Sequence, residues 1–190
     1  TDPSYSGQIV TMTYPLIANY GTNGEDSESA RVFAEGFIVR ELSRTVSSWR
    51  ATSSLDDYLK AAGVPGISDI DTRSLVRHIR ERGSMRGCLT TEQISEPAVI
   101  DRARNAPTMA GLDLASRVTC RERYEWTDDQ SSAYGSPSLL HAAGEGVAGR
   151  EPRFHIVAYD FGLKHNSLRS MASLGCRVTV VPAHTSAEDV

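Results

Sequence analysis

The chain has 190 residues, of which 39% are hydrophobic and 23% are charged, and its formal net charge is −4. This composition is typical of a globular protein with room for one full domain and part of another. The mild acidity gives no electrostatic reason to expect nucleic acid or an anionic membrane as a partner. We find neither an apolar run near the length of a membrane-spanning helix nor a signal peptide, so we expect a cytoplasmic protein.

The cysteines favour the same location. Cys88, Cys120 and Cys176 form no C-x-x-C pair and are odd in number, which is typical of reduced thiols. A thiol nucleophile in an α/β enzyme usually lies on a glycine-flanked turn between a strand and a helix. None of the three cysteines has that setting, so we expect no catalytic cysteine among them.

Alternating and β-branched residues near the amino end predict strands. Residues 8–14 form one such run, which Pro15 ends. Residues 30–42 suggest one or two more strands, with Gly36 at a bulge or turn. The Gly- and Asn-rich residues 19–26 between these runs are expected to form an exposed loop.

Three helices are expected next, each opened by a polar capping residue. They are a helix over 55–62 capped by Ser53, a helix ending at Gly83 capped by Asp69 or Asp71, and a helix capped by Ser95 that runs to about Asn105. In the second helix, Arg73, Arg77 and Arg80 share one side. We interpret this side as a solvated face, with a partner or phosphate contact as the alternative. A strand is expected at 88–90, and a short helix and strand within 111–119.

The last forty residues or so carry the clearest pattern. Residues 128–153 are rich in Ser, Gly and Pro, which indicates a linker with a domain boundary near Arg150. Residues 154–160 and 177–181 are apolar, β-branched runs, and the spacing over 164–174 is helical. Strand, helix and strand in this order predict a βαβ unit with parallel strands.

The end of the chain suggests that this unit continues. Residues 185–188 have the capping-box pattern of a helix start, yet the sequence stops at Val190. One helix cannot cover both faces of a two-stranded parallel sheet. We therefore expect the first βαβ unit of a doubly wound α/β domain whose remainder lies beyond Val190.

Asp160 ends the first strand of this unit. Ligands of open α/β sheets bind at the carboxyl ends of strands, but a carboxylate bonded to nearby helix N–H groups is the simpler interpretation. Asp160-Phe161-Gly162 matches the kinase tripeptide without the other kinase motifs, and Gly162 alone makes no dinucleotide-binding turn. The five histidines show no metal-ligand spacing, so we predict no metal site. The residues by themselves form no complete catalytic constellation.

Several stretches have a residue order that identifies a family more specifically than their chemical properties do. They occur in the family's order along nearly the whole chain. They are the opening Thr-Asp-Pro-Ser-Tyr-Ser-x-Gln-Ile-Val-Thr, the segment Ile67–Gly83 with Ile-Asp-Thr-Arg, the segment Val157–Asn166 and the segment Gly175–Asp189. Together they closely resemble the small (glutaminase) subunit of carbamoyl-phosphate synthase.

This resemblance implies two domains and a function. Residues 1–150 would form the mixed α+β amino-terminal domain that packs against the large synthetase subunit. Residues 151–190 would begin a flavodoxin-like class I glutamine amidotransferase domain. The family hydrolyses glutamine and supplies ammonia to the large subunit for carbamoyl phosphate synthesis, which serves arginine and pyrimidine biosynthesis. ATP and Mg act in the large subunit, so no cofactor is expected in this chain.

The resemblance also assigns one site residue. Ser4 matches the family position whose serine contacts bound glutamine; a turn-stabilising serine is the alternative. The family's nucleophilic cysteine, His/Glu pair and oxyanion glycines correspond to positions beyond Val190, so no residue here is assigned as catalytic. We expect this chain alone to be inactive as a glutaminase. A non-catalytic docking module for the large subunit, or a flavodoxin-like ligand-binding domain, are the alternatives.

Overall fold

The computed structural model describes residues 1–128, 152 and 154–190. The chain divides into two compact units that do not follow chain order. One unit, here called the βαβ unit, comprises Thr1–Ser4, Glu25–Ala30 and Asp113–Val190, and the other, the three-helix unit, comprises Tyr5–Gly24 and Arg31–Leu112. The predicted linker and boundary near Arg150 lie almost wholly outside the described residues.

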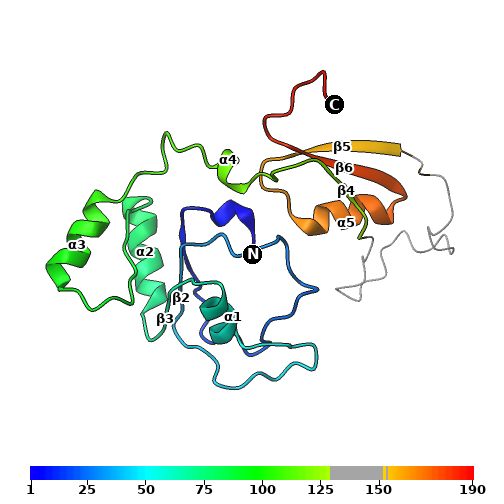
Figure 1. The fold of residues 1–190 in the computed structure, drawn as a ribbon. Coiled ribbons are helices and arrows are strands. Elements are labelled where there is room, and N and C mark those ends of the chain that lie inside the picture. The colour runs from blue at the N-terminus through cyan, green and yellow to red at the C-terminus, as the bar shows by residue number, and fades with distance from the viewer. Residues whose placement is uncertain (129–151, 153) are drawn as a thin grey trace. The chain divides into compact units, whose positions relative to one another are not determined.

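The βαβ unit has the predicted strand, helix and strand (Figure 1). Strand β5 (Phe154–Asp160), helix α5 (His165–Ser173) and strand β6 (Cys176–Pro182) follow one another. The two strands pair in parallel over their full length, from Phe154 opposite Cys176 to Asp160 opposite Pro182. This confirms the predicted unit, with Pro182 inside the second strand rather than after it.

Strand β4 (Tyr124–Trp126) extends this sheet on the other side of β6. It pairs antiparallel with β6, which gives the order β4-β6-β5. Helix α4 (Ala115–Val118) precedes it, within the stretch where a short helix was predicted. No strand forms within residues 111–119, so the strand predicted there is wrong; β4 begins only at Tyr124.

The core of the βαβ unit lies between α5 and the sheet. Leu168 of α5 and Val178 and Val180 of β6 are fully buried. The two valines are two residues apart, so they share the sheet face that α5 covers. Partly buried Cys120, Trp126, Ala158, Leu163, Met171 and Cys176 pack around them. Burying an aliphatic side chain of this size stabilises a fold by about 1.5–3 kcal/mol.

The helix start predicted at 185–188 is wrong. The described chain makes turns there instead: Ser186 Oγ donates to Asp189 Oδ2 at 2.7 Å, and Asp189 N donates to the Ser186 carbonyl at 3.2 Å. The serine hydroxyl thus bonds a side chain three residues later rather than capping a backbone N–H group.

The three-helix unit has a small parallel sheet. Its strands are β1 (Ile9–Thr11), β2 (Gly36–Ile38) and β3 (Gly66–Ile67), in the order β1-β2-β3. Strands were predicted over the first two ranges, with longer bounds. Gly36 is at no bulge: it pairs regularly with Ile9, and a Cβ there would lie 3.0 Å from Leu89 Cδ2. Close packing, not chain reversal, explains this glycine.

Another strand predicted in this unit is also wrong. Residues 88–90 form no strand. Residues 19–26 form a loop, as predicted, but only Tyr20, Gly24 and Glu25 in it are exposed; the other five residues are half-buried, and Thr22 bridges to Ser53. Thr22 N donates to the Ser53 carbonyl at 2.8 Å, so backbone pairing over a long sequence distance holds this loop.

The helices of this unit are α1 (Leu55–Ala61), α2 (Thr72–Arg82) and α3 (Glu96–Asn105). Ser54 rather than Ser53 caps α1, since its hydroxyl accepts from Asp57 N at 3.1 Å. Asp71, one of the two predicted candidates, caps α2 by accepting from Ser74 N at 3.0 Å. Ser95 precedes α3 as predicted but makes no side-chain capping bond. No helix among the described residues is long and apolar enough to cross a membrane.

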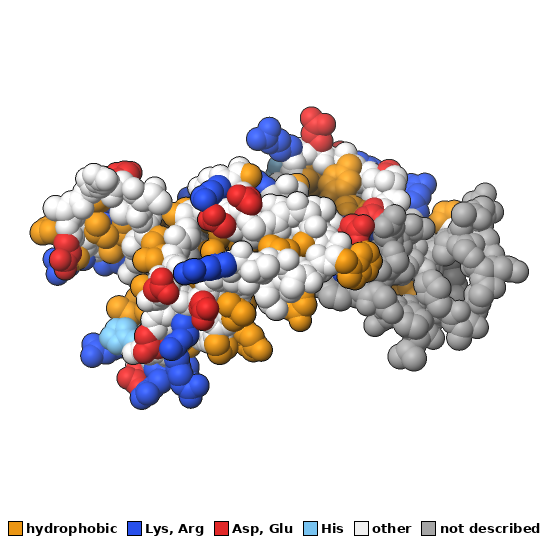
Figure 2. Space-filling model, turned by 90° about the horizontal axis from the view of Figure 1, so that it is seen from below, with side chains coloured by type: hydrophobic (Ala, Val, Ile, Leu, Met, Phe, Trp, Pro, Cys, Tyr) orange, Lys and Arg blue, Asp and Glu red, His pale blue; other side chains and the backbone are white. Residues whose placement is uncertain are grey.

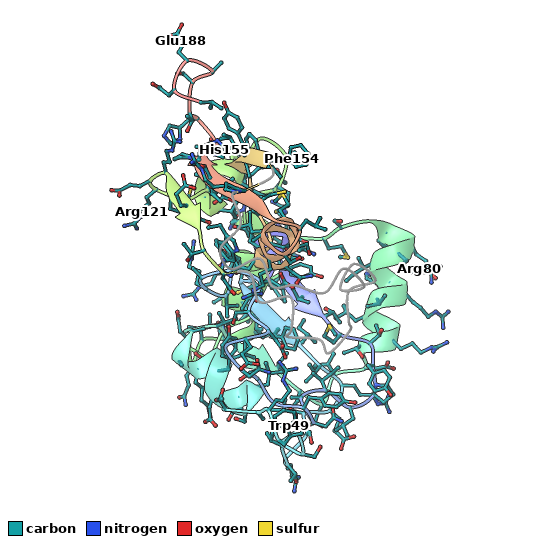
Figure 3. The ribbon with its side chains drawn as sticks, turned by 90° about the vertical axis from the view of Figure 1, so that its right-hand side faces the viewer. Trp49, Arg80, Arg121, Phe154, His155 and Glu188 are labelled. Carbon is teal, nitrogen blue, oxygen red and sulfur yellow. The ribbon has the colours of Figure 1, made fainter. Side chains whose placement is uncertain are left out.

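Large apolar side chains of the three-helix unit reach solvent. Trp49 is 93% exposed, and Tyr14 and Tyr20 are exposed to 70% and 74%. Hydrophobic side chains also lie between charged ones on the face shown in Figure 2. Figure 3 shows Trp49 and Arg80 pointing away from the ribbon. Arg73, Arg77 and Arg80 are all exposed, as expected for a solvated face.

Candidate functional site

The candidate site lies at the turn between β5 and α5, and Asp160 holds this turn. Its Oδ1 accepts from the backbone N–H groups of Gly162 and Leu163, both at 2.9 Å, and its Oδ2 accepts from Cys120 N at 2.6 Å. The side chain is buried. Three backbone donors therefore occupy this carboxylate, which favours the structural interpretation of Asp160, although the donors belong to the turn and to Cys120 rather than to a helix.

Gly162 brings the amino-terminal segment against this turn. Its φ of +99° lies in the region that side chains disfavour. A Cβ at this position would also lie only 3.1 Å from Pro3 Cβ and 3.2 Å from Val118 Cγ2. Both the backbone conformation and the close packing therefore require glycine at this position. Pro3, the residue before Ser4, packs directly on the β5–α5 turn.

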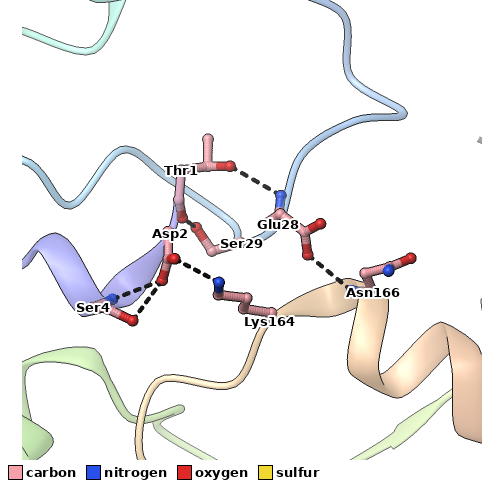
Figure 4. A network of polar contacts seen from close by, with 7 residues as sticks. All are labelled: Thr1, Asp2, Ser4, Glu28, Ser29, Lys164 and Asn166. Carbon is pink, nitrogen blue, oxygen red and sulfur yellow. Dashed lines mark hydrogen bonds and ion pairs between the residues drawn. The ribbon is translucent and has the colours of Figure 1, made fainter. Parts of the chain in front are cut away.

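Asp2 connects Ser4 to the start of α5 (Figure 4). Pro3–Tyr5 form a single 3₁₀ turn. Asp2 Oδ1 accepts from Ser4 N at 2.9 Å and from Ser4 Oγ at 2.7 Å. Asp2 Oδ2 lies 2.8 Å from Nζ of Lys164, the N-cap residue of α5. One carboxylate thus joins the serine turn to the helix.

The charge state of Asp2 follows from these partners. Its side chain is 19% exposed, and burial by itself would raise the pKa of the carboxyl. The hydrogen bonds from Lys164 and Ser4 outweigh burial and lower this pKa to about 2. Asp2 is therefore ionised at neutral pH and is paired with the Lys164 ammonium.

Glu28 makes a second tether to α5. Its carbonyl accepts from His165 N at 3.0 Å and its Oε2 accepts from Asn166 N at 2.9 Å, while its own N donates to Thr1 Oγ1 at 2.9 Å. Ser29 Oγ also donates to the Thr1 carbonyl. The first turn of a helix leaves N–H groups without intrahelical partners, and an anion there interacts well with the helix dipole. Glu28 meets both needs across 138 residues of sequence.

Arg169 fixes the next turn of α5. Its side chain is 10% exposed; Nε donates to Asp128 Oδ2 at 2.9 Å and a terminal nitrogen donates to the Ser27 carbonyl at 3.3 Å. His165 packs its ring 5.0 Å from that of Trp126. Burial, followed by the charge of Arg169, lowers the pKa of His165. These contacts join α5 to Ser27, Trp126 and Asp128 within the βαβ unit.

Ser4 is the one residue that the sequence assigned to a substrate. It is exposed, and its hydroxyl proton is directed to Asp2. The structure brings Ser4 together with Asp2, Pro3 and Lys164, whose contribution the sequence did not reveal. An aspartate two residues before a serine is a recognisable turn signal. Nothing in the sequence pairs Asp2 with a lysine 162 positions away.

The other candidates form no second site among the described residues. Cys88, Cys120 and Cys176 are free thiols, as predicted. Burial and the neighbouring Asp160 raise the pKa of Cys120, which makes it a poor nucleophile. The described residues contain no group of His, Cys, Asp and Glu side chains that could hold a metal ion, and His141 lies outside them.

The chain is similar in sequence to one family of known proteins. Residues 1–89 match the family model described as carbamoyl-phosphate synthase small chain, CPSase domain. Proteins named carbamoyl phosphate synthase small chain match the whole chain. That of Syntrophotalea carbinolica is 49% identical, with 48% of its length covered. Those of Pseudomonas aeruginosa and Vibrio cholerae are 50% and 47% identical, with 49% of each covered.

The fold agrees with this result, since the described residues form a mixed α/β protein with one parallel and one mixed sheet. Over its whole length the chain is similar to carbamoyl-phosphate synthase small chains, and their family model matches its first 89 residues. It spans about half the length of the curated relatives that it matches.

Proposed function

We propose that this chain acts as the amino-terminal half of a glutaminase subunit, which hydrolyses glutamine and passes ammonia to a large synthetase chain. The observation that carries the proposal is the similarity of all 190 residues to carbamoyl phosphate synthase small chains from several bacteria. The structure supports it in one particular: the segment that contains Ser4 packs within the same compact unit as β5 and α5.

The proposal includes a domain assignment. Residues 1–150 correspond to the amino-terminal domain of the small subunit, and residues 151–190 to the beginning of a class I amidotransferase domain with a flavodoxin-like sheet. The parallel pairing of β5 with β6 around α5 supports the second assignment, because doubly wound sheets are built from such units.

The chemistry follows from general principles of amide hydrolysis. A thiolate attacks the side-chain amide carbon, the bond to nitrogen breaks as a histidine supplies a proton, and ammonia leaves. Water then cleaves the glutamyl thioester and regenerates the thiol. In this scheme Ser4 contacts glutamine, and the thiolate and histidine come from residues beyond Val190.

The partner in this proposal is the large synthetase chain, which uses ATP and Mg to make carbamoyl phosphate for arginine and pyrimidine biosynthesis in the cytoplasm. Ammonia is protonated readily at neutral pH and then loses its nucleophilicity. Direct transfer between two associated chains therefore has a chemical reason.

The test compares the 190-residue chain with the same chain extended to the length of its relatives. Ammonia release from glutamine is measured for each, with and without a large synthetase chain from a curated relative's organism. We expect turnover from the extended chain and none above background from the 190 residues. Turnover by the 190 residues alone would contradict the assignment of the nucleophile, and none from either would contradict the glutaminase function.

A docking module without glutaminase activity is the second candidate. Within these 190 residues it requires no catalytic thiol, and the three cysteines are free, with the pKa of Cys120 raised by burial and Asp160. In a pull-down with the large synthetase chain, binding by an extended protein that releases no ammonia supports this candidate. Ammonia release by the extended protein excludes it.

A further inference from the structure

We propose that Asp2 is a positioning residue for substrate binding, which acts by fixing the Ser4 hydroxyl against the start of α5. This inference rests on the proposed function, because it takes Ser4 as a contact of glutamine. It adds a role for Asp2 and for its partner Lys164, which no motif assigned.

Asp2 restricts the geometry of Ser4. Ser4 is exposed on a single 3₁₀ turn, and so short an element provides little rigidity by itself. Asp2 removes this freedom by bonding both the backbone N–H and the hydroxyl of Ser4 to one carboxylate oxygen. The backbone bond holds the turn, and the hydroxyl bond selects the side-chain rotamer.

Lys164 in turn anchors Asp2. Asp2 would itself be mobile if it bonded only Ser4, since the two residues are neighbours on one short turn. Its other oxygen bonds Lys164, which lies in the loop that enters α5, and Pro3 rests on Gly162 in the same loop. The serine is thereby fixed to a helix that Leu168 secures in the core.

The charges of Asp2 and Lys164 offset each other. An unpaired carboxylate 2.7 Å from Ser4 Oγ would repel the carboxylate of an amino-acid substrate. The Lys164 ammonium, 2.8 Å from the other oxygen, offsets that charge. The pair can thus orient a hydroxyl without making its surroundings anionic.

The Asp2–Ser4 pair differs from another Asp–Ser turn in the same unit. Asp113 and Ser116 form a similar pair: Asp113 Oδ1 accepts from Ser116 N at 3.0 Å and Oδ2 accepts from Ser116 Oγ at 2.5 Å. Both oxygens of Asp113 bond the same serine, whereas Asp2 uses one oxygen for its serine and the other for Lys164. Asp113 is therefore a matched control within the same unit.

The experiment uses the full-length protein extended beyond Val190, assembled with its large synthetase chain, and measures kcat and KM for glutamine. We expect Asp2→Asn and Ser4→Ala each to raise KM about tenfold, with kcat changed less than about twofold, because a hydrogen bond to a charged group is lost. Asp113→Asn should leave both constants unchanged. Lys164→Met should raise KM. Lys164→Arg, which keeps the positive charge, should leave KM close to the value of the unaltered protein.

A double-mutant cycle separates positioning from general stability. If Asp2 acts through Ser4, Asp2→Asn has no further effect on KM in a Ser4→Ala background. Equal effects in both backgrounds would overturn the proposal, since Asp2 would then act independently of the serine. NMR of the 190-residue chain can follow the titration of the Asp2 carboxyl. Its pKa should rise toward the ordinary range in Lys164→Met, and an unchanged pKa would contradict the Asp2–Lys164 pair.

The outcomes also separate this proposal from the one on which it rests. If Ser4→Ala leaves KM unchanged, the substrate contact assigned to Ser4 is wrong. If Ser4→Ala raises KM and Asp2→Asn does not, Ser4 keeps its role and the positioning by Asp2 is refuted.

Discussion

The two compact units differ in what stabilises them. In the βαβ unit, two seven-residue strands pair over their full length and a helix seals Leu168, Val178 and Val180 from water. In the three-helix unit the strands have three, three and two residues, and Val39 is the only hydrophobic side chain there that is buried among the described residues. The first unit depends on a dense apolar core, and the second on backbone pairing and helix caps.

The largest effect is expected from the core of the βαβ unit. Leu168→Ala should lower the free energy of unfolding by about 2–5 kcal/mol, because the cavity lies in fully buried surroundings. Ile100→Ala in α3, where the side chain is 40% exposed, should cost about 1 kcal/mol or less. Urea unfolding followed by fluorescence measures both, since Trp126 packs in the core and Trp49 lies in the other unit. Equal losses would contradict the contrast between the units.

A smaller loss is expected at the β5–α5 turn. Gly162→Ala should destabilise the βαβ unit by about 1–3 kcal/mol, because it combines an unfavourable φ with a close approach to Pro3. Gly63→Ala is the matched control: its φ is +67°, but a Cβ there meets nothing within 4 Å, so only about 1 kcal/mol is expected. Thermal unfolding of the two variants compares them. A larger loss at Gly63 would refute the packing of Pro3 on this turn.

The cap of α1 should have a moderate effect. Ser54→Ala should cost about 1 kcal/mol, because the N–H of Asp57 loses its acceptor. Ser53→Ala, at the position that the sequence pattern indicated, should stay within about 0.5 kcal/mol. Circular dichroism during urea unfolding distinguishes the two variants. The reverse order would place the helix start one residue earlier than the structure does.

The smallest effect is the acid response of the Asp2–Lys164 pair. The pKa of Asp2 is lowered to about 2, below its unfolded value of about 3.9, so its contribution to stability is present above about pH 4 and is lost as pH falls through 2. Lys164 is half exposed, so we expect about 1 kcal/mol or less. Asp2→Asn should flatten the fall in unfolding free energy between pH 4 and pH 2. An identical slope in the variant would show that the pair does not form in solution.

Sequence patterns predicted the βαβ unit well because its signals are local and agree with one another. Continuous β-branched runs, a helical spacing and a glycine stop all lie within residues 154–182. In the three-helix unit the strands are too short for a clear alternation, so the bounds of β1 and β2 were predicted too long. The strand predicted at 88–90 is absent although its residues suit one, because β-structure requires a neighbour to pair with.

Most of the contacts at the candidate site could not be predicted from local sequence patterns. Ser4 was found through a family resemblance, and the capping role of Asp71 through its spacing to α2. The bonds that tie the amino-terminal segments to α5 run from residues 2 and 28 to residues 164–166. No local pattern encodes a pairing over such a distance, because these residues are polar types that are common on any protein surface.

The bonds of Glu28 to α5 also bear on the order of events during synthesis. Residues 1–30 are synthesised before their partners His165 and Asn166, which follow more than 130 residues later. The free energy of closing a loop rises only slowly with its length, but the search takes time. The amino-terminal segment must therefore wait, unpaired, until α5 has formed. A protein cut at residue 150 would leave the first turn of α5 without Glu28, so the two parts of this chain are best expressed together.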